Sequence, residues 1–147
     1  MVRVEASRRF EVPVDRGFAY ITNVDNWPQF WPGFVRLDPT SRWGGVGDTA
    51  QLVTRLLGRE VELTMNITRF EQNKLVVYTS SQRGLPDVRH ERHFDEDGDG
   101  FIYGLVVEYE PRPGLAGLYD RSLLRLGIRR AFRQTFAELA RRFESGA

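Results

Sequence analysis

The apolar residues of this chain change their spacing once, near Pro111, and that change limits the folds that the chain can adopt. Up to Tyr109 they mostly alternate with polar residues, most clearly over 60–67, and after Pro111 they recur every three or four residues. A period of two is typical of strands with one buried face, and a period near 3.6 is typical of an amphipathic helix. The sequence therefore predicts an α+β fold, in which an antiparallel sheet packs its apolar face against a long C-terminal helix.

Proline, glycine and Asn/Asp-rich segments divide the alternating region into separate strands. We expect about seven strands, within 2–12, 34–37, 50–57, 61–70, 74–81, 88–94 and 101–109. Two short helices are expected after the first strand, within 15–21 and 25–30. Along the chain, helices are therefore predicted at only one place between strands, directly after the first strand.

The C-terminal helix is predicted to bend near Gly127. Its apolar residues form two stripes, over 115–126 and over 128–143, which are turned by about a quarter of a circle from each other. A straight helix over 113–144 would be about 48 Å long, whereas a compact chain of this size is about 40 Å across. Glycine costs about 1 kcal/mol inside a helix, so Gly127 is the expected place for a break.

Composition excludes several classes of protein. The chain has 147 residues, which fits one domain over 1–147, and it has no cysteine, which excludes disulfide scaffolds, thiolate zinc sites and iron–sulfur clusters. Ten Phe, five Tyr and three Trp argue against disorder. There is no run of about 18 apolar residues and no apolar core of a signal peptide after Met1, so we expect a cytoplasmic protein without a membrane span.

The formal net charge of +1 hides an uneven distribution. Residues 112–147 carry eight arginines and three acidic residues, a formal charge of +5, which leaves −4 for residues 1–111. An anionic lipid surface, an acidic partner or nucleic acid could each use such a segment. Arg125, Arg129, Arg133 and Arg141 are spaced like a solvated helix face, and no aromatic residue lies among them for base stacking. We favour the solvated face and expect no nucleic-acid partner.

Four stretches of the sequence resemble the START-like, or SRPBCC, superfamily, in its polyketide cyclase/dehydrase-like branch. They are 18–32, 45–48, 69–78 and 107–111. The resemblance covers essentially the whole chain and implies a helix-grip fold, with a cavity between a curved sheet and the last helix. Relatives include cyclases and aromatases, carriers of hydrophobic ligands, hormone receptors and subunits of ring-hydroxylating oxygenases. One departure is Gly100-Phe101, where relatives usually have Gly-Thr, so we expect Phe101 at the end or rim of the cavity.

A large set of apolar and aromatic residues is predicted to face the C-terminal helix. By itself such a set indicates a hydrophobic core, but the resemblance implies that it lines a ligand cavity. The residues are Phe18, Ile21, Trp27, Trp31, Phe34, Val61, Leu63, Met65, Tyr103, Leu105, Val107, Tyr109, Leu118, Tyr119, Phe132 and Phe136.

Polar side chains are also expected on this face. If Phe94 faces the helix, alternation places His90 and Arg92 on the same side, near Tyr103. A histidine base beside an arginine that stabilises an enolate suits aldol cyclisation or dehydration. The alternatives are that 88–94 forms an edge strand with solvated charges, or that Arg92 pairs with a carboxylate such as Glu108.

The sequence predicts neither a metal site nor a cofactor. His90 and His93 are the only histidines, and their spacing places them on opposite faces of a strand, so they cannot share a metal ion.

These observations predict a protein that binds a small, mostly hydrophobic molecule, such as a lipid, a polyketide or an aromatic compound. The alternative is a polyketide cyclase/dehydrase-type enzyme that uses His90, Arg92 and Tyr103. A module that binds a partner through its basic helix, and a homodimer, also stay open.

Overall fold

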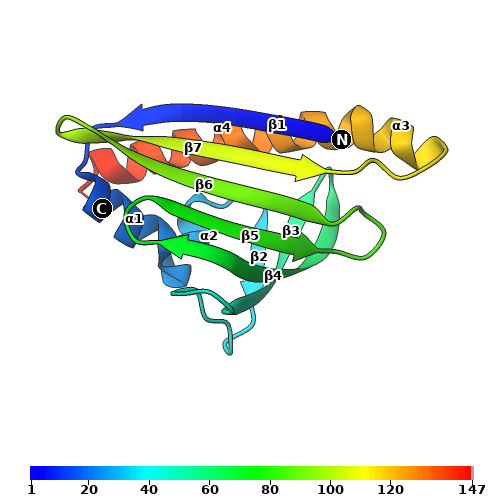
Figure 1. The fold of residues 1–147 in the computed structure, drawn as a ribbon, viewed down its shortest axis with the longest axis horizontal. Helices are drawn as coiled ribbons and strands as arrows, with labels where there is room; N and C mark the ends of the chain where they lie inside the picture. The colour runs from blue at the N-terminus through cyan, green and yellow to red at the C-terminus, as the bar shows by residue number, and fades with distance from the viewer. Residues whose placement is uncertain (147) are drawn as a thin grey trace.

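The computed structural model describes residues 1–146, which form one antiparallel sheet and a set of helices on its concave side (Figure 1). The strands are β1 (Val2–Phe10), β2 (Phe34–Leu37), β3 (Thr49–Leu56), β4 (Arg59–Glu71), β5 (Leu75–Ser81), β6 (Val88–Asp97) and β7 (Gly100–Tyr109). They follow the order β1-β7-β6-β5-β4-β3-β2, so the first strand pairs with the last and every other neighbour is consecutive in the chain. The predicted seven-stranded sheet is confirmed.

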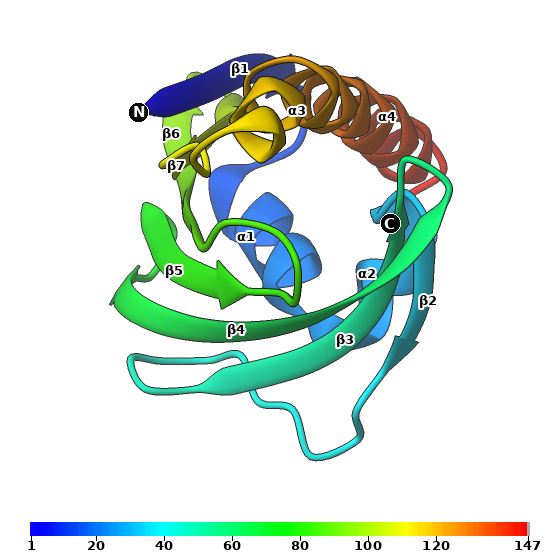
Figure 2. The same cartoon turned by 90° about the vertical axis from the view of Figure 1, so that its right-hand side faces the viewer.

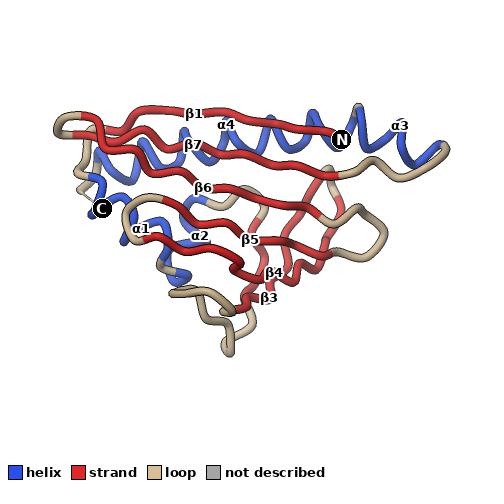
Figure 3. Tube along the Cα trace, in the orientation of Figure 1, coloured by secondary structure: helices blue, strands red, loops and turns tan. Residues whose placement is uncertain are grey.

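The helices lie in two groups. They are α1 (Val14–Thr22), the 3₁₀ turn η1 (Val24–Asn26), α2 (Trp27–Phe30), α3 (Leu115–Arg121) and α4 (Leu123–Glu144). Figure 2 shows the sheet bending into an arc from β1 to β2, with α4 lying across its open side. Figure 3 shows α1 and α2 near one end of the sheet, and α3 at the opposite end. This arrangement is the helix-grip fold that the sequence predicts.

The alternation of the sequence sets which side of each strand faces α4. In β7, Phe101, Tyr103 and Leu105 are buried on the concave side, and in β4 Met65 and Ile67 face the same way. The β4–β5 register shifts after Ile67. Such a bulge bends a strand and increases its twist, which suits the curvature of the sheet.

An aromatic cluster fills the end of the molecule near the β6–β7 turn. The rings of Phe10, Phe101 and Phe143 pack together, with centroids 5.4–6.2 Å apart. Phe94 stacks on Phe101 at 6.1 Å and meets Phe18 edge to face at 4.9 Å. Phe101 is fully buried in this cluster, so it belongs to the core rather than to a cavity rim.

The predicted break in the C-terminal helix occurs, but its predicted position was wrong. It lies at Ser122, whose φ of −116° and ψ of −81° are not helical, and α4 continues through Gly127. Gly127 is buried against the β3–β4 turn, where a Cβ would come within 3.1 Å of the Leu57 side chain. Close approach of the turn, and not helix breaking, therefore accounts for this glycine.

The β3–β4 turn also lies one residue earlier than expected. Leu56 pairs with Arg59, which leaves Leu57 and Gly58 as a two-residue turn. Both have positive φ, 52° and 79° respectively, as in the type I′ turn that suits the twist of a hairpin. Leucine rarely adopts this conformation, which favours Asn or Gly at the first position.

None of the helices in residues 1–146 is long and apolar enough to cross a membrane.

Candidate functional site

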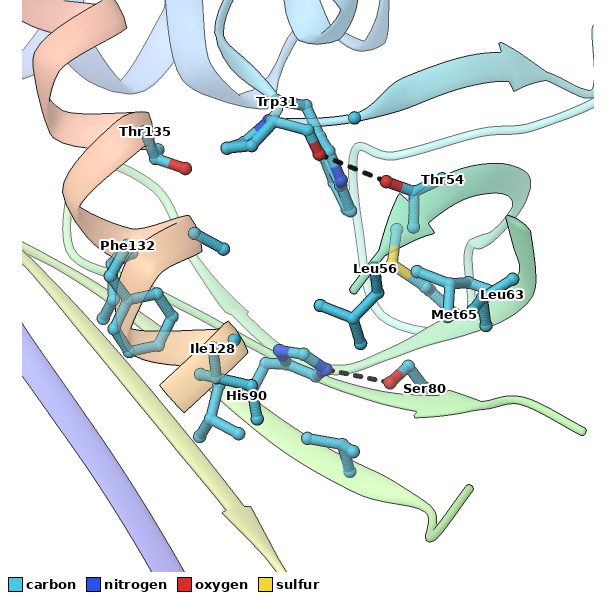
Figure 4. A pocket seen from close by; sticks show the side chains of 18 of the residues that line it. Trp31, Thr54, Leu56, Leu63, Met65, Ser80, His90, Ile128, Phe132 and Thr135 are labelled. Atoms are coloured by element: carbon cyan, nitrogen blue, oxygen red, sulfur yellow. Dashed lines mark hydrogen bonds between the residues drawn. The ribbon is translucent and has the colours of Figure 1, made fainter. Parts of the chain in front are cut away.

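A cavity of about 490 Å³ lies between the concave face of the sheet and α4. Ligand sites in proteins commonly have volumes between about 300 and 1,000 Å³. Figure 4 shows Leu63 and Met65 of β4 on one side of the open space, and Ile128 and Phe132 of α4 on the other. These side chains give the cavity a mostly apolar wall.

The cavity reaches the surface at one edge. Its exposed lining residues are Arg55, Leu57 and Gly58 at the end of the β3–β4 hairpin, Gly33 before β2, and Arg130 and Gln134 on α4. Access to the cavity therefore runs between the hairpin and the helix. The aromatic cluster fills the core beyond the opposite end.

Four polar side chains form a connected group on the cavity wall. His90 lies flat against Tyr78, its partner across the β5–β6 ladder, with ring centroids 4.3 Å apart and planes 7° apart. Arg92 reaches over the same tyrosine, and its Nη2 donates to the Tyr78 hydroxyl at 2.8 Å. Ser80 Oγ lies 2.9 Å from His90 Nε2. Alternation along β5 and β6 places these side chains on one face of the sheet.

Burial controls the protonation of this group. Burial lowers the pKa of His90 well below its ordinary value, and the nearby Arg92 cation lowers it further. Burial raises the pKa of Tyr78, against the opposing effect of Arg92. Burial also raises the pKa of Tyr103 far above its ordinary value. At neutral pH the wall therefore presents a neutral imidazole, two phenolic hydroxyls and one guanidinium.

Most of the residues that the sequence predicted for the site lie on this wall. All three candidate catalytic residues line it. The lining includes Ile21, Trp27, Trp31, Val61, Leu63, Met65, His90, Arg92, Tyr103, Leu105, Val107 and Phe132.

Six predicted residues lie elsewhere: Phe18, Phe34, Tyr109, Leu118, Tyr119 and Phe136. Phe18 and Phe136 pack in the aromatic core. The side chain of Leu118 on α3 is 62% exposed, because the break at Ser122 ends α3 before it can follow the line of α4. The hydroxyl of Tyr109 donates to the main-chain carbonyl of Asp120.

Both alternatives for β6 are excluded by the structure. The strand lies between β5 and β7, so it is not an edge strand. Arg92 does not pair with Glu108, which instead accepts from Arg3 and Arg89 on the outer face. His90 lines the cavity, whereas His93 bonds to Glu91.

Sequence reasoning missed several lining residues. Tyr78 and Ser80 could have been found from alternation in β5, since they share a face with buried Val76. Gln82 and Leu85 lie in the β5–β6 loop, and loop residues carry no periodic signal that would aim them at the cavity.

The ion pair between Arg112 and Asp120 connects the β5–β6 loop with α3 beside the cavity. Asp120 is fully buried, and it accepts hydrogen bonds from the backbone N–H, Nε and Nη2 of Arg112. Arg112 also donates to the carbonyl of Gly84 in the β5–β6 loop. The pair joins the end of β7, the helix α3 and this loop.

Residues 1–146 contain no group of three or more His, Asp or Glu side chains that could hold a metal ion.

Comparison with known proteins supports the fold. The crystal structure of TTHA0849 from Thermus thermophilus matches with a TM-score of 0.82 and 17% identity, over 99% of this chain and 100% of that one. The Zhui aromatase/cyclase from a Streptomyces species matches at 0.72 and 13% identity, over 95% and 89%. Ara h 8.0201 matches at 0.75 and 15% identity, over 99% of both chains. Identities this low concern the fold alone.

No curated protein sequence matches the chain significantly. Residues 1–144 match the family described as polyketide cyclase / dehydrase and lipid transport. This match spans nearly the whole chain and agrees with the helix-grip fold and the START-like resemblance. The chain therefore belongs to the polyketide cyclase/dehydrase and lipid transport family.

Proposed function

We propose that the protein binds a small, mostly hydrophobic molecule, such as a lipid, a polyketide or an aromatic compound, and that the whole chain acts as one ligand-binding domain. One observation carries this proposal: a cavity of about 490 Å³ stays open between sheet and helix, although the adjoining core is densely packed with aromatic rings. Proteins normally fill their interiors, and mostly apolar cavities with a few polar groups are typical of ligand sites.

Native mass spectrometry of protein purified from its own host tests this proposal. We expect the protein to retain a small molecule. The variant Ala131→Trp, on the cavity side of α4, should lose it because the new side chain fills the space. The matched variant Ala137→Trp, on the exposed side of the same helix, should keep it. Retention of the same molecule by both variants would contradict binding in this cavity.

A second candidate function is catalysis of the cyclase/dehydrase type. The observation that favours it is that His90, Arg92 and Tyr103 all line the cavity. Neutral His90 would take a proton from the carbon beside a substrate carbonyl, and Arg92 would donate to the enolate oxygen. The enolate carbon would then form a bond to a second carbonyl carbon of the same molecule, and Tyr103 would supply a proton to the new alkoxide. The proton taken up by His90 would then return to Tyr103, which restores both residues.

Turnover of a poly-β-ketone analogue, followed by mass spectrometry, separates the two candidates. An enzyme should lose turnover on both His90→Gln and Arg92→Gln substitution, whereas loss of turnover is not expected from Arg89→Gln on the outer face. An unreacted analogue that nevertheless binds would favour the carrier.

A further inference from the structure

Two buried nitrogen atoms on the cavity wall lack a hydrogen-bond partner within residues 1–146. They are Nδ1 of His90 and Nη1 of Arg92. Buried polar atoms are nearly always paired, because an unpaired one loses its bonds to water without compensation. Both residues line the cavity and lie two positions apart on β6. Neighbouring atoms cover both nitrogens in this structure, so a molecule in the cavity becomes their partner once the side chains around them shift.

A chain of three hydrogen bonds fixes which nitrogen of His90 carries the hydrogen. The Gln82 amide donates through Nε2 to the Pro86 carbonyl, which can only accept. The Gln82 oxygen Oε1 therefore faces Ser80, whose hydroxyl lies 3.1 Å away. Since Ser80 has one hydrogen and Gln82 Oε1 can only accept, that hydrogen goes to Gln82.

Ser80 Oγ can then only accept from His90. His90 must consequently carry its hydrogen on Nε2, which lies 2.9 Å from Ser80 Oγ. In the neutral imidazole the other nitrogen is then a bare acceptor. Figure 4 shows this second nitrogen on the side of the ring away from Ser80. Burial and the Arg92 cation keep the ring neutral because they lower its pKa.

Arg92 supplies the complementary group. Its Nη2 donates to Tyr78, and it forms no ion pair with any side chain of residues 1–146. Its unpaired Nη1 is a donor with a positive charge, and such a group prefers an oxygen that carries full or partial negative charge. The wall thus carries one acceptor and one cationic donor on residues two positions apart on β6.

We propose that the ligand carries an acidic hydroxyl group, as in a carboxylic acid, a phenol or an enol, which donates to His90 Nδ1 and accepts from Arg92 Nη1. This inference rests on the proposed function, because it names the polar group of the same ligand. Ser80 and Gln82 are positioning residues that act through the His90 ring.

Several other ligand chemistries leave one or both atoms unpaired. A pure hydrocarbon pairs neither atom. A ketone, an ester or an ether accepts from Arg92 but offers no hydrogen to His90. An amine cation would meet the positive charge of Arg92. An acidic hydroxyl in its protonated form satisfies both atoms, and the Arg92 cation attracts the partial negative charge on its oxygen.

Nitrogen-15 NMR of the imidazole rings tests the hydrogen-bond chain directly at pH 7. The spectrum contains only two histidines, and His93→Gln assigns them. We expect a neutral His90 with its hydrogen on Nε2. Ser80→Ala should shift the ring toward the other tautomer, and Ser80→Thr, which keeps the hydroxyl, should preserve it. A wild-type His90 with its hydrogen on Nδ1 would overturn the inference.

A pair of probes tests the ligand group. We expect 2-naphthol to bind about tenfold more tightly than 2-methoxynaphthalene, whose ether cannot donate. In Ser80→Ala this preference should fall severalfold while the ether binds as before. The matched variant Ser81→Ala, on an exposed position of the same strand, should keep the full preference.

Failure of the acidic-hydroxyl inference can be distinguished from failure of the proposed function. Equal binding of both probes to the wild type would overturn the acidic-hydroxyl inference and leave the cavity function standing. If neither probe binds and native mass spectrometry also finds no retained molecule, the proposed function fails and the ligand inference fails with it.

Discussion

His90 makes the stability of the protein depend on pH. Burial lowers its pKa in the folded state below the ordinary value of 6.5, whereas the unfolded chain keeps the ordinary value. The unfolded state therefore binds more protons, so the stabilisation is present above about pH 6.5 and is lost as the pH falls.

We expect the free energy of unfolding to decrease between pH 7 and pH 5, by at most about 1.4 kcal/mol per pH unit from this residue. Urea denaturation of wild type and His90→Gln measures the effect. The variant should show a shallower slope, and identical slopes would contradict the assignment.

Asp120 is the second residue with a predictable effect. Hydrogen bonds and the charge of Arg112 hold its pKa below the ordinary value, so its stabilisation is present above about pH 4 and is lost at lower pH. Asp120→Asn should destabilise the protein by about 2–4 kcal/mol at pH 7, less than the full cost of breaking a buried pair because Arg112 is partly exposed.

Chemical denaturation at pH 7 measures this change. Asp87→Asn, at an exposed carboxylate near the same loop, serves as its control and should change stability by less than about 0.5 kcal/mol. A similar small effect at both positions would show that the Arg112–Asp120 pair stabilises little.

Alternation predicts the facing of individual residues well, and this explains which site residues could be anticipated. His90 and Arg92 face the cavity because Phe94, two positions further, faces the core. The chain through Ser80 and Gln82 could not be anticipated, because Gln82 reaches Ser80 only through the path of the β5–β6 loop.

At the scale of elements, the β3–β4 turn and α4 each carry a residue that is locally unfavourable. Leu57 has a positive φ, and Gly127 lies within a helix of good helix formers. The contact between them links the two, since the leucine side chain lies 3.1 Å from the point where any other residue at 127 would place its Cβ. Each residue is thus understood only through the other.

This coupling predicts a non-additive pair of substitutions. Gly127→Ala should change wild-type stability little, because better helix propensity is offset by crowding at Leu57. In a Leu57→Asn background the same substitution should stabilise by about 1 kcal/mol, since the crowding is gone. Thermal and urea denaturation of the four proteins measure the difference.

Ala137→Gly on the exposed face of α4 is the control for this cycle. It should cost about 1 kcal/mol in both backgrounds. If Gly127→Ala has the same effect in both backgrounds, the two residues are not coupled.

The same contact explains why the helix break was placed five residues too late. Spacing indicates that the apolar stripe changes direction between Leu126 and Ile128. Propensity then selects the glycine in that interval, but a packing contact between distant segments overrides propensity. The break falls instead at Ser122, whose hydroxyl donates to the Leu118 carbonyl.

At the scale of the molecule, the change from alternating to helical spacing predicts the layers, and the proline, glycine and Asn/Asp-rich segments predict the number of strands. The spacing pattern by itself does not predict the cavity. An apolar face packs either against a filled core or around a ligand space, and the same sequence periodicity serves both. The size of the space depends on how far the curved sheet stands from α4.

Ligand binding should stabilise the whole fold. At a probe concentration one hundred times its dissociation constant, 2-naphthol should add about 2.7 kcal/mol, which raises the melting temperature by about 5–10 °C for a chain of this size. Differential scanning fluorimetry measures the shift. Ala131→Trp should abolish the shift and Ala137→Trp should retain it, and an equal shift in both would place the probe elsewhere.

The contact between Leu57 and Gly127 affects the rates at which a ligand enters and leaves the cavity. These two residues lie where the cavity opens to the surface, so a molecule wider than the gap can pass only while the hairpin tip and the helix are apart. Entry and exit would then slow down together, which leaves the dissociation constant unchanged. A ligand held in this way would have a long residence time even if its equilibrium affinity were modest.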